Sequence, residues 1–275
     1  MRPALYTAIA LALAAGAAAQ EPPIGPFHKS GQGVTPAFEG WFQNPDGTYS
    51  ILFGYFNRNR EQELDIPIGP DNRIEPGGPD RGQPTHFLPG RQWGLFTVTV
   101  PKDFGDRKIT WTLTANGQTN SIPASLAPLW ELEPLQDANG DTPPVLRFDG
   151  GASVQGPRPV TVSLSTAVGS PLALNVQASD DARLIPGMQR PKTPPVTLTW
   201  SKFRGPGAVA FANPTPPVEP VDDSSAGFRG NASTTATFSQ PGDYMLYLVA
   251  NDWSGKGGRG FQCCWTNALV KVSVK

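Results

Sequence analysis

Apolar and polar residues alternate with a period of two along much of this chain, which is the pattern of half-buried β-strands. After the N-terminal segment, no stretch keeps the 3.6-residue period of an amphipathic helix. At 44–47 the sequence Asn-Pro-Asp-Gly separates two alternating runs, and a proline followed closely by a glycine favours a tight turn. The sequence therefore predicts a β-hairpin over 38–55, followed by strands at 95–100, 109–113 and 118–122.

The second half repeats this alternation in short runs, at 160–164, 172–178, 196–200, 234–238, 244–250 and 268–274. Between the halves, residues 136–144 are polar and rich in turn formers. Short strands with regular turns between them are typical of a β-sandwich. We therefore expect an all-β protein with two β-sandwich domains in tandem, at 27–135 and 145–275. Residues 136–144 are expected to form a linker on which few contacts depend.

The sequence TATFSQPGDYMLYLVAND at 235–252 resembles the strand–turn–strand signature of the PKD-like (polycystic-kidney-disease-type) immunoglobulin-like domains. The preceding Leu198-Thr199-Trp200 is similar to the central-strand tryptophan segment of that family. The chain departs from the family after Trp200, where Ser201 to Gly205 replace a turn rich in Asp and Gly. The resemblance covers 145–275 and implies an immunoglobulin-like sandwich that serves as a non-catalytic extracellular module. The first domain resembles no family of assigned function.

Residues 1–19 carry the features of a secretory signal peptide. Met1-Arg2 gives a positive start, Ala4 to Ala15 form an apolar run of 12 residues, and Ala17 to Ala19 fit a cleavage site. Such a run is too short to span a bilayer, which takes about 20 residues. We expect a Sec-type signal that exports the protein to the periplasm, the cell envelope or the exterior. The mature chain is expected to contain no integral membrane segment.

The charge balance argues against two classes of partner. Lys and Arg total 22 and Asp and Glu total 23, which gives a net charge of −1. Nucleic acids and anionic membrane surfaces attract proteins through an excess of positive charge, so we expect neither as a partner. Charged residues make up only 16% of the chain, while Gly and Pro number 30 and 31, in keeping with a turn-rich β protein.

Both cysteines of the chain, Cys263 and Cys264, are adjacent. Neighbouring side chains on a strand point to opposite faces. Their Cα atoms would lie about 3.8 Å apart across a trans peptide, below the usual disulfide range of about 4.4–6.8 Å. An exported compartment nevertheless favours oxidation. Three states stay open at this stage: a strained vicinal disulfide, unpaired or intermolecular thiols, and a metal or redox site.

One end of the second sandwich is the expected ligand-binding pole. In immunoglobulin-like connectivity the B–C and F–G loops emerge at the same end, and an Asp-Asp pair opens the first loop while Asn-Asp opens the second. Tryptophans beside such loops can stack on sugars or protein partners. The candidate ligand-binding residues are Asp180, Asp181, Asn251, Asp252, Trp253 and Trp265. No cofactor is implied, and Ca²⁺, which prefers oxygen ligands, is the alternative here. Turn formation by the acidic residues and packing of the indoles also stay open.

Signals of catalysis are weak in this sequence. It contains neither G-x-S-x-G nor H-E-x-x-H, and no catalytic residue is assigned from it. His86 has no identifiable partner in the sequence and is predicted to be a loop or packing residue. We expect an exported, non-enzymatic surface or envelope module for binding or adhesion to a protein or glycan. The alternative is an exported enzyme, or a thiol-redox or metal-binding protein, that uses Cys263 and Cys264.

Overall fold

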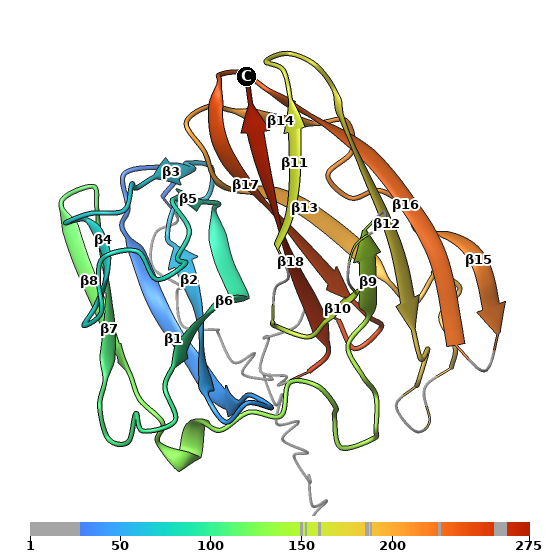
Figure 1. Cartoon of the computed structure of the whole chain (residues 1–275), viewed down its shortest axis with the longest axis horizontal. Helices are drawn as coiled ribbons and strands as arrows, with labels where there is room; N and C mark the ends of the chain where they lie inside the picture. Colours follow the sequence, from blue (N-terminus) through green and yellow to red (C-terminus); the bar gives the residue numbers. More distant parts are fainter. Residues whose placement is uncertain are drawn as a thin grey trace, which may run out of the picture.

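The computed structural model describes residues 28–148, 151, 153–158, 161–184, 187, 189–224, 227–255 and 263–275. The predicted signal peptide, 1–19, lies outside these residues. In Figure 1 the strands of residues 34–124, coloured blue to green, lie beside the strands of residues 145–274, which are mostly yellow to red. Within the described part of the chain, no helix is long and apolar enough to cross a membrane.

The first half consists of two three-stranded antiparallel sheets and a two-stranded ribbon. The sheets have the orders β1-β2-β6 and β4-β7-β8, and β3 pairs with β5 in the ribbon. The predicted hairpin is confirmed, because Trp41 pairs with Ile51 across the turn at 44–47. The bounds are β1 (Val34–Gln43), β2 (Tyr49–Asn57), β3 (Leu64–Asp65), β4 (Asn72–Glu75), β5 (His86–Phe87), β6 (Gly90–Val100), β7 (Ile109–Ala115), β8 (Gln118–Ala124) and the 3₁₀ turn η1 (Pro128–Trp130).

Aromatic side chains fill the space between the two N-terminal sheets. Phe53 stacks on Phe96 with ring centroids 5.5 Å apart, and Trp111 meets Phe96 edge to face at 5.0 Å. The Trp111 indole is fully buried and donates its Nε1 hydrogen to Asn72 Oδ1 at 3.1 Å. A buried indole N–H needs such a partner, since an unsatisfied donor would destabilise the core.

The second half is a sandwich of two sheets. One has the order β10-β9-β12-β16-β14, with β15 also paired to β16, and the other has the order β11-β18-β17-β13. β11 runs parallel to β18, and this division of strands is that of the immunoglobulin fold. The bounds are β9 (Val145–Phe148), β10 (Ser153–Gln155), β11 (Thr161–Thr166), β12 (Leu172–Asp180), β13 (Thr197–Arg204), β14 (Val209–Phe211), β15 (Glu219–Ser224), β16 (Gly227–Phe238), β17 (Gly242–Asn251) and β18 (Trp265–Val274). The expected all-β fold of β-sandwich domains is confirmed, while the finer PKD-like assignment stays a prediction.

Trp200 lies at the centre of the C-terminal sandwich. Its indole is 2% exposed and meets the ring of Phe148, on the opposite sheet, at 6.4 Å. The inward residues of β17 and β18, such as Leu246 and Val270, are fully buried in the same core. The residues of this core all fall between 146 and 274, so the second half has a complete core of its own.

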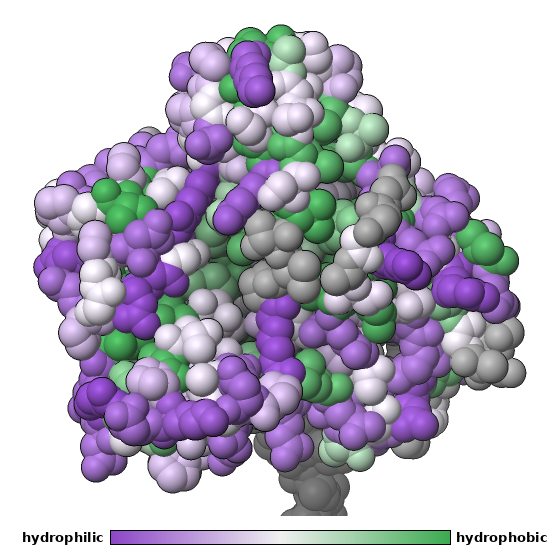
Figure 2. Space-filling view, viewed as in Figure 1, coloured by the Kyte–Doolittle hydropathy of each residue, from purple (hydrophilic) through white to green (hydrophobic). Residues whose placement is uncertain are grey.

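The outer face of the β13-β17-β18 sheet packs on the first half. Phe203 and Tyr247 project from this face, are 1% and 5% exposed, and belong to the same buried cluster as the N-terminal core. Their rings stack at 6.0 Å. The side of the molecule shown in Figure 2 is mostly hydrophilic, with apolar residues in small patches. The sheet face bearing Phe203 and Tyr247 is instead covered by the other half of the chain.

Polar contacts flank this apolar interface. Lys202 forms an ion pair with Asp65 at 3.0 Å, and Arg204 forms one with Asp80 at 2.8 Å. Both cations come from the segment 201–205, where the sequence departs from the PKD-like pattern. The departure therefore has a physical reason: β13 continues through residues that bind the first half instead of ending in a turn.

The segment 136–144 makes several specific contacts. Asp141 is 7% exposed, Thr142 donates two hydrogen bonds to the carboxylate of Asp181, and the carbonyl of Pro144 accepts one from Thr266 Oγ1. The prediction that few contacts depend on this segment is wrong. A stretch of turn formers can be tied down by hydrogen bonds to distant residues, which its composition does not reveal.

Two substitutions distinguish the contribution of the C-terminal core to stability from the contribution of the interface between the halves. Trp200→Ala should destabilise both the whole protein and an isolated fragment 145–275 by about 3–5 kcal/mol, because the cavity lies inside the fragment's own core. Phe203→Ala should destabilise the whole protein by a similar amount and leave the fragment nearly unchanged, since the fragment already exposes that ring to water. Urea denaturation followed by circular dichroism measures both free energies of unfolding.

The same experiment tests independent folding. The wild-type fragment 145–275 should unfold cooperatively, with lower stability than the whole chain. A fragment that is disordered before urea is added would contradict the assignment of a self-contained core, and an equal loss for Phe203→Ala in fragment and whole chain would contradict the interface.

Candidate functional site

The ends of β12 and β17 meet at one pole of the C-terminal sandwich. β12 ends at Asp180, β17 ends at Asn251, and the carboxylates of Asp181 and Asp252 are close enough to raise the pKa of Asp180. Asn251 is 7% exposed, and its backbone carbonyl accepts a hydrogen bond from Thr197 Oγ1 at 3.3 Å. The structure thus brings together the acidic residues of the two loops that the connectivity predicted.

A fourth carboxylate, that of Asp141, joins them from the segment between the two halves. It lies within hydrogen-bonding reach of the carboxylates of Asp181 and Asp252 and is itself buried. From the sequence, this residue was expected to lie in a linker, and it was not among the predicted site residues. The sequence nevertheless contained a signal of a polar site in this segment, because oxygen-bearing side chains alternate at Asp137, Asn139 and Asp141. Asp137 Oδ1 accepts hydrogen bonds from the backbone N–H groups of the other two, at 2.7 and 2.9 Å.

Two carboxylate oxygens at this pole are buried without a donor. Asp252 is 6% exposed; its Oδ1 accepts hydrogen bonds from the backbone N–H and hydroxyl of Ser254, but no donor among the described residues reaches its Oδ2. Asp180 repeats the arrangement, with Oδ1 bonded to the N–H of Ala182 at 2.7 Å and Oδ2 without a donor. Buried polar atoms nearly always have a partner, so these two oxygens require an explanation.

Burial and mutual repulsion shift the ionisation of these groups. Burial is the largest cause that raises the pKa of Asp141, and the adjacent Asp252 carboxylate raises it further. Burial also raises the pKa of Asp180 to about 7, although its hydrogen bond from Ala182 acts in the opposite direction. The pKa of Asp252 is raised chiefly by burial as well, against the hydrogen bonds from Ser254. Without a counter-charge, the pole therefore favours protons on some of its carboxyl groups.

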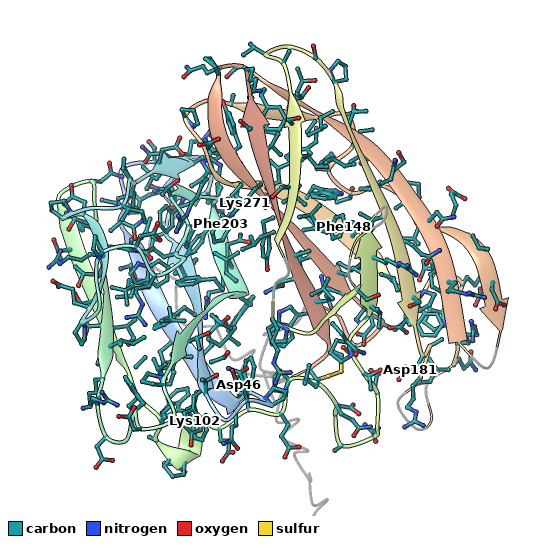
Figure 3. All side chains as sticks on the ribbon, viewed as in Figure 1. Asp46, Lys102, Phe148, Asp181, Phe203 and Lys271 are labelled. Atoms are coloured by element: carbon teal, nitrogen blue, oxygen red, sulfur yellow. A yellow bond between two sulfur atoms is a disulfide. The ribbon has the colours of Figure 1, made fainter. Side chains whose placement is uncertain are left out.

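The two cysteines lie directly beside this acidic pole. Their sulfurs are bonded to one another in the structure, and the residues are 5% and 0% exposed. Figure 3 shows the disulfide, in yellow, near Asp181 at the lower end of the sandwich. The Sγ of Cys264 lies 3.4 Å from the backbone oxygen of Asp141, and it lies within 4.8 Å of a carboxylate oxygen of Asp141 and of Asp252. Among the described residues, this is the group whose ligand atoms are close enough to hold a metal ion.

The two tryptophans named from the sequence do not form an exposed binding platform. Trp265 is 1% exposed and donates its Nε1 hydrogen to the carbonyl of Gly94 at 3.4 Å, so it packs between the halves. Its proposed role in stacking on a ligand is corrected to that of an interface residue. Trp253 is half-buried, donates to the carbonyl of Thr193 at 3.2 Å and lies 5.1 Å beneath the guanidinium of Arg190.

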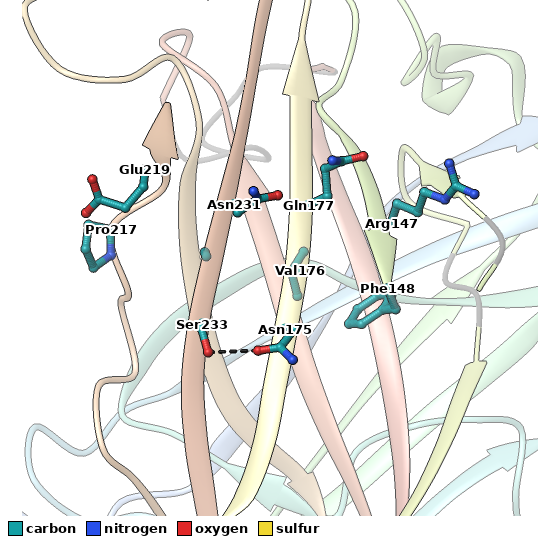
Figure 4. Close-up of a pocket in the computed structure, with 10 residues that line it drawn as sticks. Arg147, Phe148, Asn175, Val176, Gln177, Pro217, Glu219, Asn231 and Ser233 are labelled. Carbon is teal, nitrogen blue, oxygen red and sulfur yellow. Dashed lines mark hydrogen bonds between the residues drawn. The ribbon is translucent and has the colours of Figure 1, made fainter. Parts of the chain in front are cut away.

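A polar groove crosses the outer face of the other sheet of the sandwich (Figure 4). Strand register places four exposed side chains in one row: Arg147 on β9 opposite Gln177 on β12, Gln177 opposite Asn231 on β16, and Asn231 opposite Glu219 on β15. The volume of the open groove is about 770 Å³. The row could not be predicted from the sequence because it depends on the register of four strands, although Gln177 is a polar residue of an alternating run.

His86 has acidic partners that the sequence did not reveal. Its Nδ1 lies 2.9 Å from Asp65 Oδ1, and its Nε2 lies 3.3 Å from Glu63 Oε2. Lys202 contacts the same Asp65 oxygen from the second half, beside a cleft of about 670 Å³ between the halves. The histidine therefore belongs to a charged network at the interface, rather than being only a loop or packing residue as predicted.

Comparisons with known proteins give no family for this chain. No family model matches it, and no curated protein matches it in sequence. Among solved structures it is similar to domains 4 and 5 of the S-layer protein SbsC, at 12% identity over 88% of this chain and 96% of that chain, with a TM-score of 0.24. It is also similar to a PapD-like domain of human CEP192, at 12% identity over 52% and 92%, with a TM-score of 0.25. CfaE, the adhesive subunit of CFA/I fimbria of enterotoxigenic Escherichia coli, has 7% identity over 91% and 89%, with a TM-score of 0.26. At such TM-scores these likenesses carry no argument about function.

The bonding of the two sulfurs predicts how the protein reacts with thiol reagents. The native protein should contain no thiol that reacts with a chromogenic disulfide reagent, and reduction in denaturant should release two thiols. Replacing both Cys263 and Cys264 by serine should speed amide exchange at 251–255 and 263–267, because the restraint beside the acidic pole is lost. β11, at the edge of its sheet, provides the internal control and should be unchanged.

Two results would contradict this prediction. One is a native protein that titrates two free thiols without reduction. The other is unchanged amide exchange around the pole in the serine variant, when the wild-type thiols have been shown to be paired.

Proposed function

We propose that this protein is an exported, non-enzymatic surface or envelope module that binds an uncharged glycan in the groove formed by β9, β12, β15 and β16. The observation that carries the proposal is the row Arg147–Gln177–Asn231–Glu219, in which four neighbouring strands present polar side chains on one exposed face. Neighbouring strands are about 4.8 Å apart, so the row extends over about 14 Å, which suits an extended ligand.

The chemistry of the row suits a ligand with many hydroxyl groups. A side-chain amide offers two donors and one acceptor oxygen, so Gln177 and Asn231 can each donate hydrogen bonds to hydroxyl groups or accept hydrogen bonds from them. Asn175 and Ser233 continue the polar surface on the same strands and are themselves joined by a hydrogen bond of 2.8 Å. The charges of Arg147 and Glu219 offset one another, so the groove attracts no strongly charged ligand.

The other chemical groups of the described chain favour binding over catalysis. Both ring nitrogens of His86 contact carboxylates, so neither faces a serine or cysteine that it could activate. The cysteines are buried and bonded to each other, which keeps them from an external thiol substrate. Asp141 and Asp252 of the acidic pole are buried too, whereas the groove is open to large ligands.

The proposal is tested by affinity electrophoresis against a panel of neutral polysaccharides. The panel includes dextran, galactomannan and a mixed-linkage β-glucan. At least one should retard the wild-type protein, and the double variant Gln177→Ala/Asn231→Ala should bind it at least tenfold more weakly. Both side chains are exposed, so the free energy of unfolding should change by about 0.5 kcal/mol or less for each substitution. Gln118→Ala, an exposed amide on β8 of the first half, is the matched control and should bind like the wild type.

Two outcomes would overturn the glycan assignment. Retardation of wild type and double variant to the same extent would place binding elsewhere on the molecule. Failure of the whole panel, with capture of a protein partner that the double variant loses, would assign the groove to a protein instead.

A further inference from the structure

The acidic pole gathers more negative charge than the described part of the chain balances. Asp141, Asp180, Asp181 and Asp252 meet there, and the first and last are less than a tenth exposed. Among the described residues, no lysine or arginine forms an ion pair with any of the four. An isolated buried carboxylate strongly disfavours folding unless a proton or a cation neutralises it.

The donorless oxygens of this pole point to a cation. Asp252 is 94% buried, because only 6% of its surface is exposed, and its Oδ2 accepts no hydrogen bond from the described residues. A carboxylate oxygen of this residue lies within 4.8 Å of one from Asp141. The Oδ2 of Asp180 is likewise buried without a donor. An oxygen that lacks a donor and faces other carboxylates is suited to a metal ion, which supplies positive charge without a hydrogen.

We propose that the acidic pole binds a Ca²⁺ ion through carboxylate oxygens of Asp141 and Asp252, which lie within 4.8 Å of one another, while Asp180 and Asp181 add negative charge beside it. Ca²⁺ is bound by 6–8 oxygen ligands in flexible geometry, and water or backbone oxygens would complete the shell around these two carboxylates. Zn²⁺ prefers nitrogen and sulfur ligands, and here the nearest sulfur, that of Cys264, is bonded to Cys263 and does not offer a thiolate. The ligand set is therefore of the hard-oxygen type.

The ion would link two parts of the chain that are distant in sequence. Asp141 comes from the segment that joins the two halves and Asp252 follows β17, while Asp180 and Asp181, which lie at and just after the end of β12, contribute charge beside the ion. Ca²⁺ would thus stabilise the junction between the halves as well as the end of the sandwich. An extracellular medium supplies Ca²⁺ at concentrations that suit even weak sites of extracellular modules. This inference is independent of the proposed glycan groove, which lies on the outer face of the sheet.

Calcium titration of the full chain, stripped with EDTA, tests the proposal by differential scanning calorimetry. Ca²⁺ at about a hundredfold excess over its dissociation constant should raise the melting temperature by about 5–10 °C. Mg²⁺ at the same concentration should have little effect, because it demands a tighter octahedral site. Asp252→Asn and Asp141→Asn should abolish the response. Asp243→Asn, at an exposed aspartate at the start of β17, should keep it.

A second measurement, made on the wild-type protein, tests the proposal even if the variants fail to fold. Tb³⁺, a luminescent stand-in for Ca²⁺, should emit on excitation of tryptophan in the wild-type protein, since Trp253 follows Asp252 directly, and Ca²⁺ should displace it. The proposal would be overturned if Ca²⁺ did not change the melting temperature of the wild-type protein. It would also be overturned if Ca²⁺ still raised the melting temperature of both Asp252→Asn and Asp141→Asn. A shift seen only with Zn²⁺ and only after reduction would also overturn it, in favour of a thiolate site at Cys264.

Discussion

The contact of Phe203 and Tyr247 with the N-terminal core is the interaction on which the arrangement of the whole molecule depends. Both rings stand on the outer face of an immunoglobulin-like sheet, where exposed polar residues are usual, yet both are almost completely buried. Removing two aromatic side chains from water stabilises the contact by about 1.5–3 kcal/mol for each ring. The two sandwiches therefore meet through a shared core rather than through a hinge.

A close approach between the backbone of Gly94 in the first half and Trp265 in the second extends this contact toward the acidic pole. Gly94 has a φ of +54°, and a Cβ at that position would lie 2.5 Å from the ring of Trp265, so only glycine fits there. Its carbonyl accepts hydrogen bonds from both Trp265 and Asn267, and Asn267 in turn accepts one from the hydroxyl of Tyr247 at 2.7 Å. The start of β18 is thus fixed against the first half. This places the cysteines and the segment 136–144 beside the ends of β12 and β17.

Local pattern in the sequence was sufficient to predict the longer strands, but not the short strands β3, β4, β5, β9, β10, β14 and β15. Alternation identified most strands, the Pro-Asp-Gly turn identified the first hairpin, and the tryptophan at 200 was correctly placed in a sandwich core. The prediction that the B–C and F–G loops meet also followed from connectivity, since strand order determines which loops share a pole.

The features missed from the sequence all depend on contacts between distant residues. Composition marked 136–144 as a linker, but the burial of Asp141 arises from contacts with residues about 40 and 110 positions later. The identity of Trp265 in the sequence is the same whether its ring faces water or packs on Gly94, so its burial could not be predicted from the sequence alone. The row across the groove depends on the register of four strands, and a shift of one residue in any strand would turn its side chain inward.

The contact of Phe203 and Tyr247 with the N-terminal core implies that the two halves form one rigid body. Nitrogen-15 relaxation of backbone amides measures it most directly, because it reports the rotational correlation time of each half separately. One shared correlation time, appropriate to the mass of the whole protein, is the predicted result for β1–β8 and β9–β18. Two shorter and different correlation times would show that the halves tumble independently and that the contact does not hold them together.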